Sequence, residues 1–211
     1  MGKWHGGLIV VLVLFIGSAG CLDAFFERPI PPMTPTLTPL PSTPAAKEST
    51  TATFSPADMA LQLSDLPDDY FIRDRSATSY DQQTALNRDL GWRQGYFVSF
   101  YRMNIDRVDI TGITQTLGIY APENMNKVYS QAKSELLTIG NATELYEIPF
   151  PVLGDRSIAI RKKGAENRHD VVTYSVIFTR KNVFEMISMT GTTTDSETLI
   201  DVAQRAVAVI R

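Results

Sequence analysis

The chain has 211 residues, with 20 Lys and Arg against 23 Asp and Glu, a formal net charge of −3 and a single cysteine. This slightly acidic balance lacks the basic excess that a phosphate backbone favours, so we expect no nucleic-acid partner. One cysteine and two histidines also exclude a disulfide framework and a zinc site built on thiolates. We expect neither a metal nor another cofactor.

The first residues have the pattern of an export signal. A positive charge at Lys3 precedes nine apolar residues, Leu8 to Ile16, and small residues then lead to Cys21. The cysteine directly after these small residues resembles the lipobox of prokaryotic lipoproteins. That resemblance implies cleavage between Gly20 and Cys21, with lipid attached to the Cys21 thiol. Residues 1–20 are therefore predicted to be a signal peptide.

Two alternatives to the lipoprotein leader stay open. The leader could be kept as a membrane helix, although such a helix needs about 20 mostly apolar residues. The run from Leu8 to Ile16 is shorter, and extending it to Phe26 takes in Asp23. The leader could also be cleaved and the protein released, but that leaves Cys21 unexplained. A covalent lipid can hold a folded domain on a membrane.

Residues 21–54 are predicted to be a tether between the lipid and the folded domain. Proline and threonine recur from Pro29 to Phe54, and few residues there could build a core. Such a stretch favours a partly extended, polyproline-like spacer. The predicted location is therefore the cell membrane, with the domain held outside the cytoplasm.

Residues 55–211 are predicted to form one globular domain. Ser55 is expected to cap a short first helix, with Pro56 in its first turn. Tyr70 to Arg73 indicates a strand. Ser79 to Leu90 is predicted to be a second helix, which Ser79 caps and Gly91 ends.

The middle of the domain is predicted to be a hairpin followed by a helix. Gly95–Met103 and Val108–Tyr120 alternate with the period of two that is typical of strands. Apolar residues at steps of three and four then predict a helix over Pro122–Ile139. Asn141 follows in an Asn-Ala-Thr sequence, which is a candidate N-glycosylation site.

Four strands and a last helix complete the domain. The strands are expected at 143–148, 157–161, 171–179 and 183–190, and the last two form a hairpin. Thr194 and Glu197 have the spacing of a capping box for a helix that runs to Ile210. The fold class is therefore α+β, with a mainly antiparallel sheet of about six to seven strands covered by amphipathic helices.

The element order, with Leu153-Gly154-Asp155-Arg156-Ser157 opening a strand after the central helix, resembles the PsbP/Mog1-type fold. Many small exported lipoproteins have that fold. The resemblance covers about residues 56–211 and implies an accessory or partner-binding role, although a fold alone does not fix a function.

No stretch of the sequence has a motif that identifies an enzymatic reaction. The two histidines are His5, in the leader, and His169, in a polar stretch where we expect a solvated turn. There is no G-x-S-x-G, P-loop or G-x-G-x-x-G motif. Asp65, Asp68 and Asp69 lie near a turn without the spacing of a calcium loop. We therefore predict a protein that is not an enzyme. The alternative is an envelope hydrolase that uses carboxylate catalysis, because its paired acids need not be adjacent in sequence.

A cluster of cations is a further charged feature of the domain. Arg161, Lys162, Lys163 and Arg168 are predicted to lie at a hairpin end, as a candidate anion contact or as a solvated loop. The aromatic residues around Tyr96 are expected in the core, although Trp92 or one of them could line a groove. The predicted partners are the membrane, through lipid on Cys21, and an unknown envelope protein or small ligand.

Overall fold

A computed structural model describes residues 55–104, 109–138, 144–166 and 169–210. The predicted leader, the tether with Cys21, the Asn141 sequon and Arg168 lie outside the described residues.

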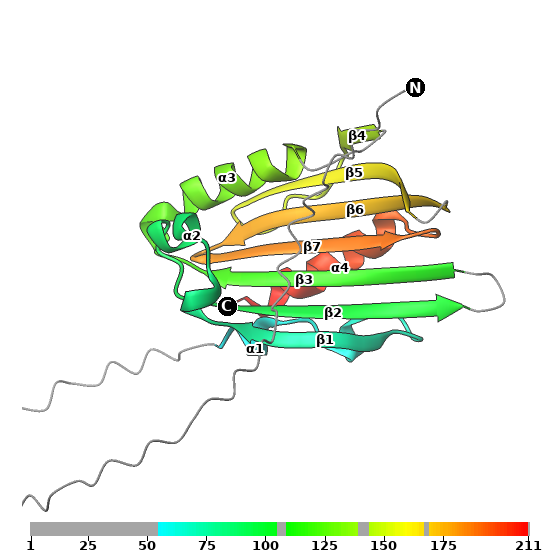
Figure 1. Ribbon diagram of the computed structural model, residues 1–211, viewed down its shortest axis with the longest axis horizontal. Helices are drawn as coiled ribbons and strands as arrows, with labels where there is room; N and C mark the ends of the chain where they lie inside the picture. Colours follow the sequence, from blue (N-terminus) through cyan, green and yellow to red (C-terminus); the bar gives the residue numbers. More distant parts are fainter. Residues whose placement is uncertain (1–54, 105–108, 139–143, 167–168, 211) are drawn as a thin grey trace, which may run out of the picture. The chain divides into compact units, whose positions relative to one another are not determined.

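A seven-stranded sheet with the order β1-β2-β3-β7-β6-β5-β4 forms the centre of the domain (Figure 1). Every neighbouring pair is antiparallel, which confirms the predicted fold class. The strands are β1 Phe71–Thr78, β2 Gln94–Asn104, β3 Asp109–Ile119, β4 Glu144–Glu147, β5 Arg156–Glu166, β6 His169–Arg180 and β7 Val183–Gly191.

The described part of the chain has four α-helices and three 3₁₀ turns. They alternate with the strands in the order that the sequence predicts. The helices are α1 Pro56–Met59, α2 Ala85–Asp89, α3 Met125–Thr138 and α4 Ser196–Val209, and the turns are η1 Leu63–Asp65, η2 Tyr80–Gln82 and η3 Pro122–Asn124.

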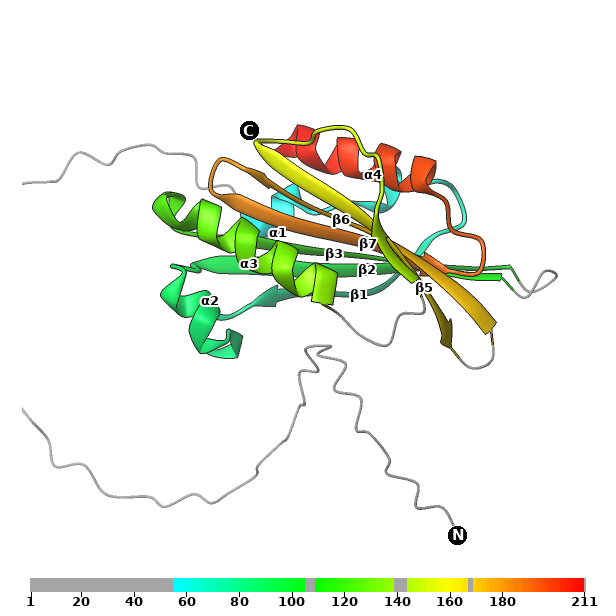
Figure 2. The same cartoon turned by 90° about the horizontal axis from the view of Figure 1, so that it is seen from above.

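Helices pack on both faces of the sheet, with α3 and α4 on opposite sides (Figure 2). On the side that we call the α4 face, α4 and the segment around α1 cover one large core that includes Phe100, Phe178 and Leu199. On the other side, the α3 face, α3 buries Leu136 against Ile160 and Ile177. Alternating side chains of the central strands therefore enter cores on opposite faces of the sheet, because successive residues of a strand point to opposite faces.

The predicted helix over Ser79–Leu90 is wrong. Ser79 instead caps the short η2 turn, where its backbone N–H donates to the Gln82 side chain over 2.8 Å. The backbone is then extended, and Thr84 caps the five-residue α2 by accepting from the Asn87 N–H over 3.2 Å. Two polar caps five residues apart divide the segment, because each makes hydrogen bonds with the backbone or side chains of its own short turn.

The last helix also begins differently from the prediction. Asp195, not Thr194, is the N-cap of α4, and its Oδ1 accepts from the Thr198 N–H over 2.7 Å. The Thr194 hydroxyl donates instead to the Val172 carbonyl over 3.1 Å. The long-range bond to β6 fixes the Thr194 side chain and leaves the neighbouring acid to cap the helix.

Three strands are longer than the sequence indicates. β1 continues to Thr78, and β5 and β6 continue through most of the stretch predicted to be a turn, as far as the pair Glu166 and His169. Polar residues can extend a ladder where the neighbouring strand supplies the backbone partners, so tertiary pairing overrides weak local propensity. Of the basic residues predicted at a turn, the described Arg161, Lys162 and Lys163 therefore lie on a strand.

Candidate functional site

The predicted cation cluster does not lie on one surface. Arg161, Lys162 and Lys163 are consecutive on β5, so they alternate between faces. Arg161 and Lys163 pair in register with Tyr174 and Val172, whereas Lys162 lies on the α3 face. The three described cations thus cannot surround one small ion together, and the anion contact itself stays a prediction.

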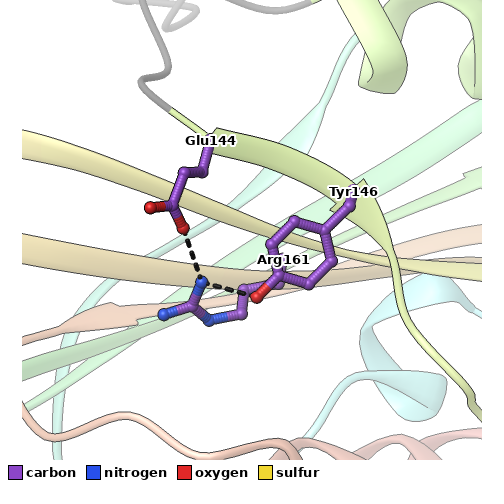
Figure 3. A network of polar contacts seen from close by, with 3 residues as sticks. All are labelled: Glu144, Tyr146 and Arg161. Carbon is purple, nitrogen blue, oxygen red and sulfur yellow. Dashed lines mark hydrogen bonds and ion pairs between the residues drawn. The ribbon is translucent and has the colours of Figure 1, made fainter.

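Arg161 has partners within the domain (Figure 3). Its Nη1 lies 2.7 Å from the Tyr146 hydroxyl and 3.3 Å from the Glu144 carboxylate. The guanidinium also lies over the Tyr146 ring, at 5.5 Å from the centroid. Both partners belong to β4, the short strand at the sheet edge. Arg161 therefore holds β4 against β5.

A groove at the opposite end of the sheet is a better candidate for a binding site. It has a volume of about 460 Å³ and lies on the α4 face, between the α1 segment and the outer strands β1 and β2. Its lining consists of Ala57, Asp58, Leu61 and Gln62 from the α1 segment, Ile72 and Arg75 from β1, and Tyr96 and Val98 from β2.

The groove combines an apolar floor with a charged rim. Leu61 and Val98 are buried, while Asp58 and Arg75 are exposed and Tyr96 is half-buried. Among the described residues, the side chains of Asp58, Arg75 and Tyr96 make no hydrogen bond or ion pair. One anion, one cation and one hydroxyl are thus available to a ligand, in a groove whose lining also includes apolar side chains.

A buried side-chain network supports the inner wall of this groove. The Leu61 N–H donates to Gln115 Oε1 over 2.7 Å. Gln115 Nε2 in turn donates to Glu185 Oε1 over 2.6 Å. Gln115 and Glu185 have no solvent exposure. The network therefore ties the α1 segment to β3 and β7 in the middle of the sheet.

Glu185 is the most unusual titratable group of the described residues. Burial raises its pKa from 4.5 to about 8, although the hydrogen bond from Gln115 acts in the opposite direction. Its Oε2 has no hydrogen-bond partner among the described residues. The carboxyl is therefore mostly protonated at neutral pH. Because no part of it reaches solvent, we assign it a positioning role and no contact with a ligand.

Sequence reasoning found part of this site. The aromatic residues around Tyr96 were expected mainly in the core, and Phe100 is buried there whereas Tyr101 is exposed. The sequence left open that Trp92 or one of these residues lines a groove, and Tyr96 lines this one. Gln115 and Glu185 were missed, although both occupy inward positions of alternating strands, between apolar residues. A polar residue at such a position signals a buried network. Arg75 was missed because β1 is longer than predicted.

A second surface feature lies on the α3 face, at the far end of β1, β2 and β3. Phe71, Tyr101, Met103 and Ile110 are 58%, 37%, 53% and 55% exposed there. The Phe71 and Tyr101 rings are 5.8 Å apart. No cavity is described at this apolar patch, whereas Asp58 and Arg75 line one groove, so we regard the groove as the candidate site.

Among the described residues, no group of three or more His, Cys, Asp or Glu side chains is placed to hold a metal ion. Within the same residues, no helix has the length and apolar character needed to cross a membrane.

Comparisons with known proteins give a structural match only. No known protein family matches the sequence, and no curated protein matches it. Among solved structures, the chain is similar to the extracellular domain of PknH from Mycobacterium tuberculosis, with a TM-score of 0.51 and 8% identity. The match covers 72% of this chain and 93% of the PknH domain. At this identity the likeness shows a shared fold, and that fold occurs in an extracellular domain. The PsbP/Mog1 resemblance stays a prediction.

Proposed function

We propose that this protein is a membrane-anchored extracytoplasmic lipoprotein whose domain binds a small ligand in the groove between α1, β1 and β2. The anchor is lipid on Cys21, and residues 21–54 are the tether. The domain acts as a non-enzymatic binding module. The observation that carries the binding function is the groove, where Asp58 and Arg75 face one space without pairing to each other.

Two independent observations support the location outside the cytoplasm. The first is the leader, in which an apolar run and small residues precede the only cysteine. The second is the fold, which this chain shares with the extracellular domain of PknH. Neither observation depends on the groove, so location and binding can be tested separately.

The groove favours binding over hydrolysis. Carboxylate catalysis on a glycosidic bond requires two acids that flank the bond. Of the eight residues that line the groove, Asp58 is the one acid. Glu185 lies behind the wall, without solvent contact. An envelope hydrolase remains the alternative, and activity of the full chain on chromogenic glycosides would support it.

The anchor is tested with Cys21→Ala in the native host. The wild-type chain is expected to incorporate labelled palmitate and to sediment with membranes. The variant should lose the label and stay as an unprocessed precursor. The wild type under an inhibitor of lipoprotein signal peptidase should instead keep the label and stay uncleaved. Ser18→Ala, which keeps the cysteine, is the matched control. Equal labelling and processing of both variants would exclude lipidation at Cys21.

The binding function is tested by thermal unfolding of the full chain in the presence of a broad library of small molecules. A ligand that binds the folded state raises the unfolding temperature. A true ligand should lose this effect in Tyr96→Ala, whereas Tyr80→Ala, an exposed tyrosine outside the groove, should keep it. A library without a single stabilising compound, or with compounds insensitive to Tyr96, would contradict a binding role for this groove.

A further inference from the structure

The charges of the groove identify the class of its ligand. We infer that the groove binds a small zwitterion that carries a primary amine, a carboxylate and an apolar body, as an apolar amino acid does. This inference rests on the proposed binding function and narrows it to one chemistry.

The first step is that two residues of opposite charge, Asp58 and Arg75, line the same groove. Arg75 presents a planar guanidinium that can donate two parallel hydrogen bonds to a carboxylate. Asp58 presents a carboxylate that can accept from an ammonium group. The two side chains line the same groove and form no ion pair with each other. A ligand that carries both charges can therefore satisfy both residues at once.

The second step excludes ligands of one sign. A dianion such as a phosphate would gain from Arg75 but would also meet the like charge of Asp58 across the same groove. A simple amine would be attracted by Asp58 and repelled by Arg75. A molecule with separated opposite charges avoids both repulsions, so the groove discriminates through unfavourable as well as favourable contacts.

The third step is the apolar floor. Leu61 and Val98 are buried at the base of the groove, and Ile72 and Tyr96 extend the apolar surface toward its opening. An exposed ion pair contributes little on its own, so the body of the ligand must cover this floor. The volume of about 460 Å³ lies within the usual range of small-molecule sites. An aromatic or branched aliphatic side chain fits that role.

The wall that carries Leu61 is fixed before the ligand arrives. Its N–H is held by Gln115 over 2.7 Å, and Gln115 is held by Glu185 over 2.6 Å. On the rim, Gln62 Nε2 donates to the Ala60 carbonyl over 2.8 Å. A preformed wall reduces the ordering cost of binding, which matters for a ligand with few atoms.

The test compares three probes that share one ring. L-phenylalanine carries both charges, 3-phenylpropanoate only the carboxylate, and phenethylamine only the amine. Isothermal titration of the full-length protein should give a dissociation constant of about 0.1 to 1 mM for L-phenylalanine. Each singly charged probe should bind about tenfold or more weakly.

Two variants assign the contacts to residues. Asp58→Asn should weaken L-phenylalanine and phenethylamine by about fivefold to tenfold and leave 3-phenylpropanoate unchanged or tighter. Arg75→Gln should weaken L-phenylalanine and 3-phenylpropanoate and leave phenethylamine unchanged or tighter. Asp81→Asn and Arg93→Gln, two exposed positions outside the groove, are matched controls. Thermal unfolding of all four variants would check that they fold.

The possible outcomes separate this inference from the proposed function. Equal binding of the three probes, or equal effects of the groove and control variants, would overturn the zwitterion inference. If a singly charged or neutral library compound binds in a manner that depends on Tyr96 and L-phenylalanine does not, the groove keeps its binding role and the inference alone fails. If nothing binds at the groove, both fail.

Discussion

Gln115 Nε2 lies 2.6 Å from Glu185 Oε1 in the core, where the two side chains reach across the neighbouring strands β3 and β7. Both side chains are fully buried. The same Gln115 accepts from the Leu61 N–H, so one amide group joins the middle of the sheet to the wall of the groove.

The first prediction is that the unfolding free energy falls as the pH rises from about 5 to 8. Burial raises the pKa of Glu185 from 4.5 to about 8, so between these values the folded state holds a proton that the unfolded state has lost. Stability therefore decreases with rising pH in this window, by up to about 1.4 kcal/mol per pH unit from this group. Below the window both states are protonated, and the effect ends.

Urea unfolding of the wild type and Glu185→Gln across this pH range measures the effect. The neutral amide keeps an acceptor for Gln115 and cannot ionise, so the variant should lose the slope and become more stable than the wild type at pH 8. Glu123→Gln, which is exposed, should retain the slope. Parallel pH profiles of the wild type and Glu185→Gln would show that Glu185 does not titrate as described.

The second prediction concerns Gln115→Leu. The change removes both amide hydrogen bonds, and it leaves the Leu61 N–H and the Glu185 carboxyl buried without these partners. We expect a loss of about 2 to 4 kcal/mol in unfolding free energy. Hydrogen exchange at the Leu61 amide should accelerate more than exchange in β6. Gln131→Leu, which removes an exposed bond to Glu135, should change stability by less than about 0.5 kcal/mol.

The third prediction uses two glycines with different surroundings. Gly154 has φ of +60°, and a Cβ there would clash with the Thr179 carbonyl oxygen. Gly154→Ala should therefore destabilise the domain by about 2 kcal/mol or more, through backbone strain and a clash with backbone. A Cβ at Gly164 would meet no atom within 4 Å. Gly164→Ala should leave the denaturant midpoint unchanged or slightly higher, and a similar loss for both variants would contradict this account.

Local patterns predicted the fold class and the element order because each strand and helix carries its own periodicity. The segment from Ser79 to Leu90 shows where that reasoning fails. Ser79 and Thr84 are both good N-caps, and the sequence pattern does not indicate whether one long helix or two short turns follow them. The predicted ends of the strands were wrong for a related reason. β5 extends to Glu166 because β6 supplies backbone partners, and that pairing cannot be read from propensity alone.

The candidate site was less predictable because it is assembled from distant segments. Asp58, Arg75 and Tyr96 come from three different elements, and only the sheet order brings them to one groove. The predicted cations show the reverse case. Arg161 and Lys162 are adjacent in sequence, yet the alternation of a strand places them on opposite faces. Residues that are close in sequence therefore suggested a cation cluster that the fold divides, whereas the residues of the groove are too far apart in sequence to suggest a site.

The fourth prediction is that Arg161 holds the edge strand β4 in place and that Lys162 does not. Arg161 Nη1 contacts both Glu144 and Tyr146, whereas Lys162 lies on the other face. In Arg161→Met, amide exchange within Glu144–Glu147 should accelerate by about threefold to tenfold, as expected for the loss of a partly exposed pair at the sheet edge. Lys162→Met should leave that exchange unchanged. Because the pair is partly exposed, salt should weaken the Arg161 effect, and equal exchange in the two variants would mean that backbone pairing alone holds β4.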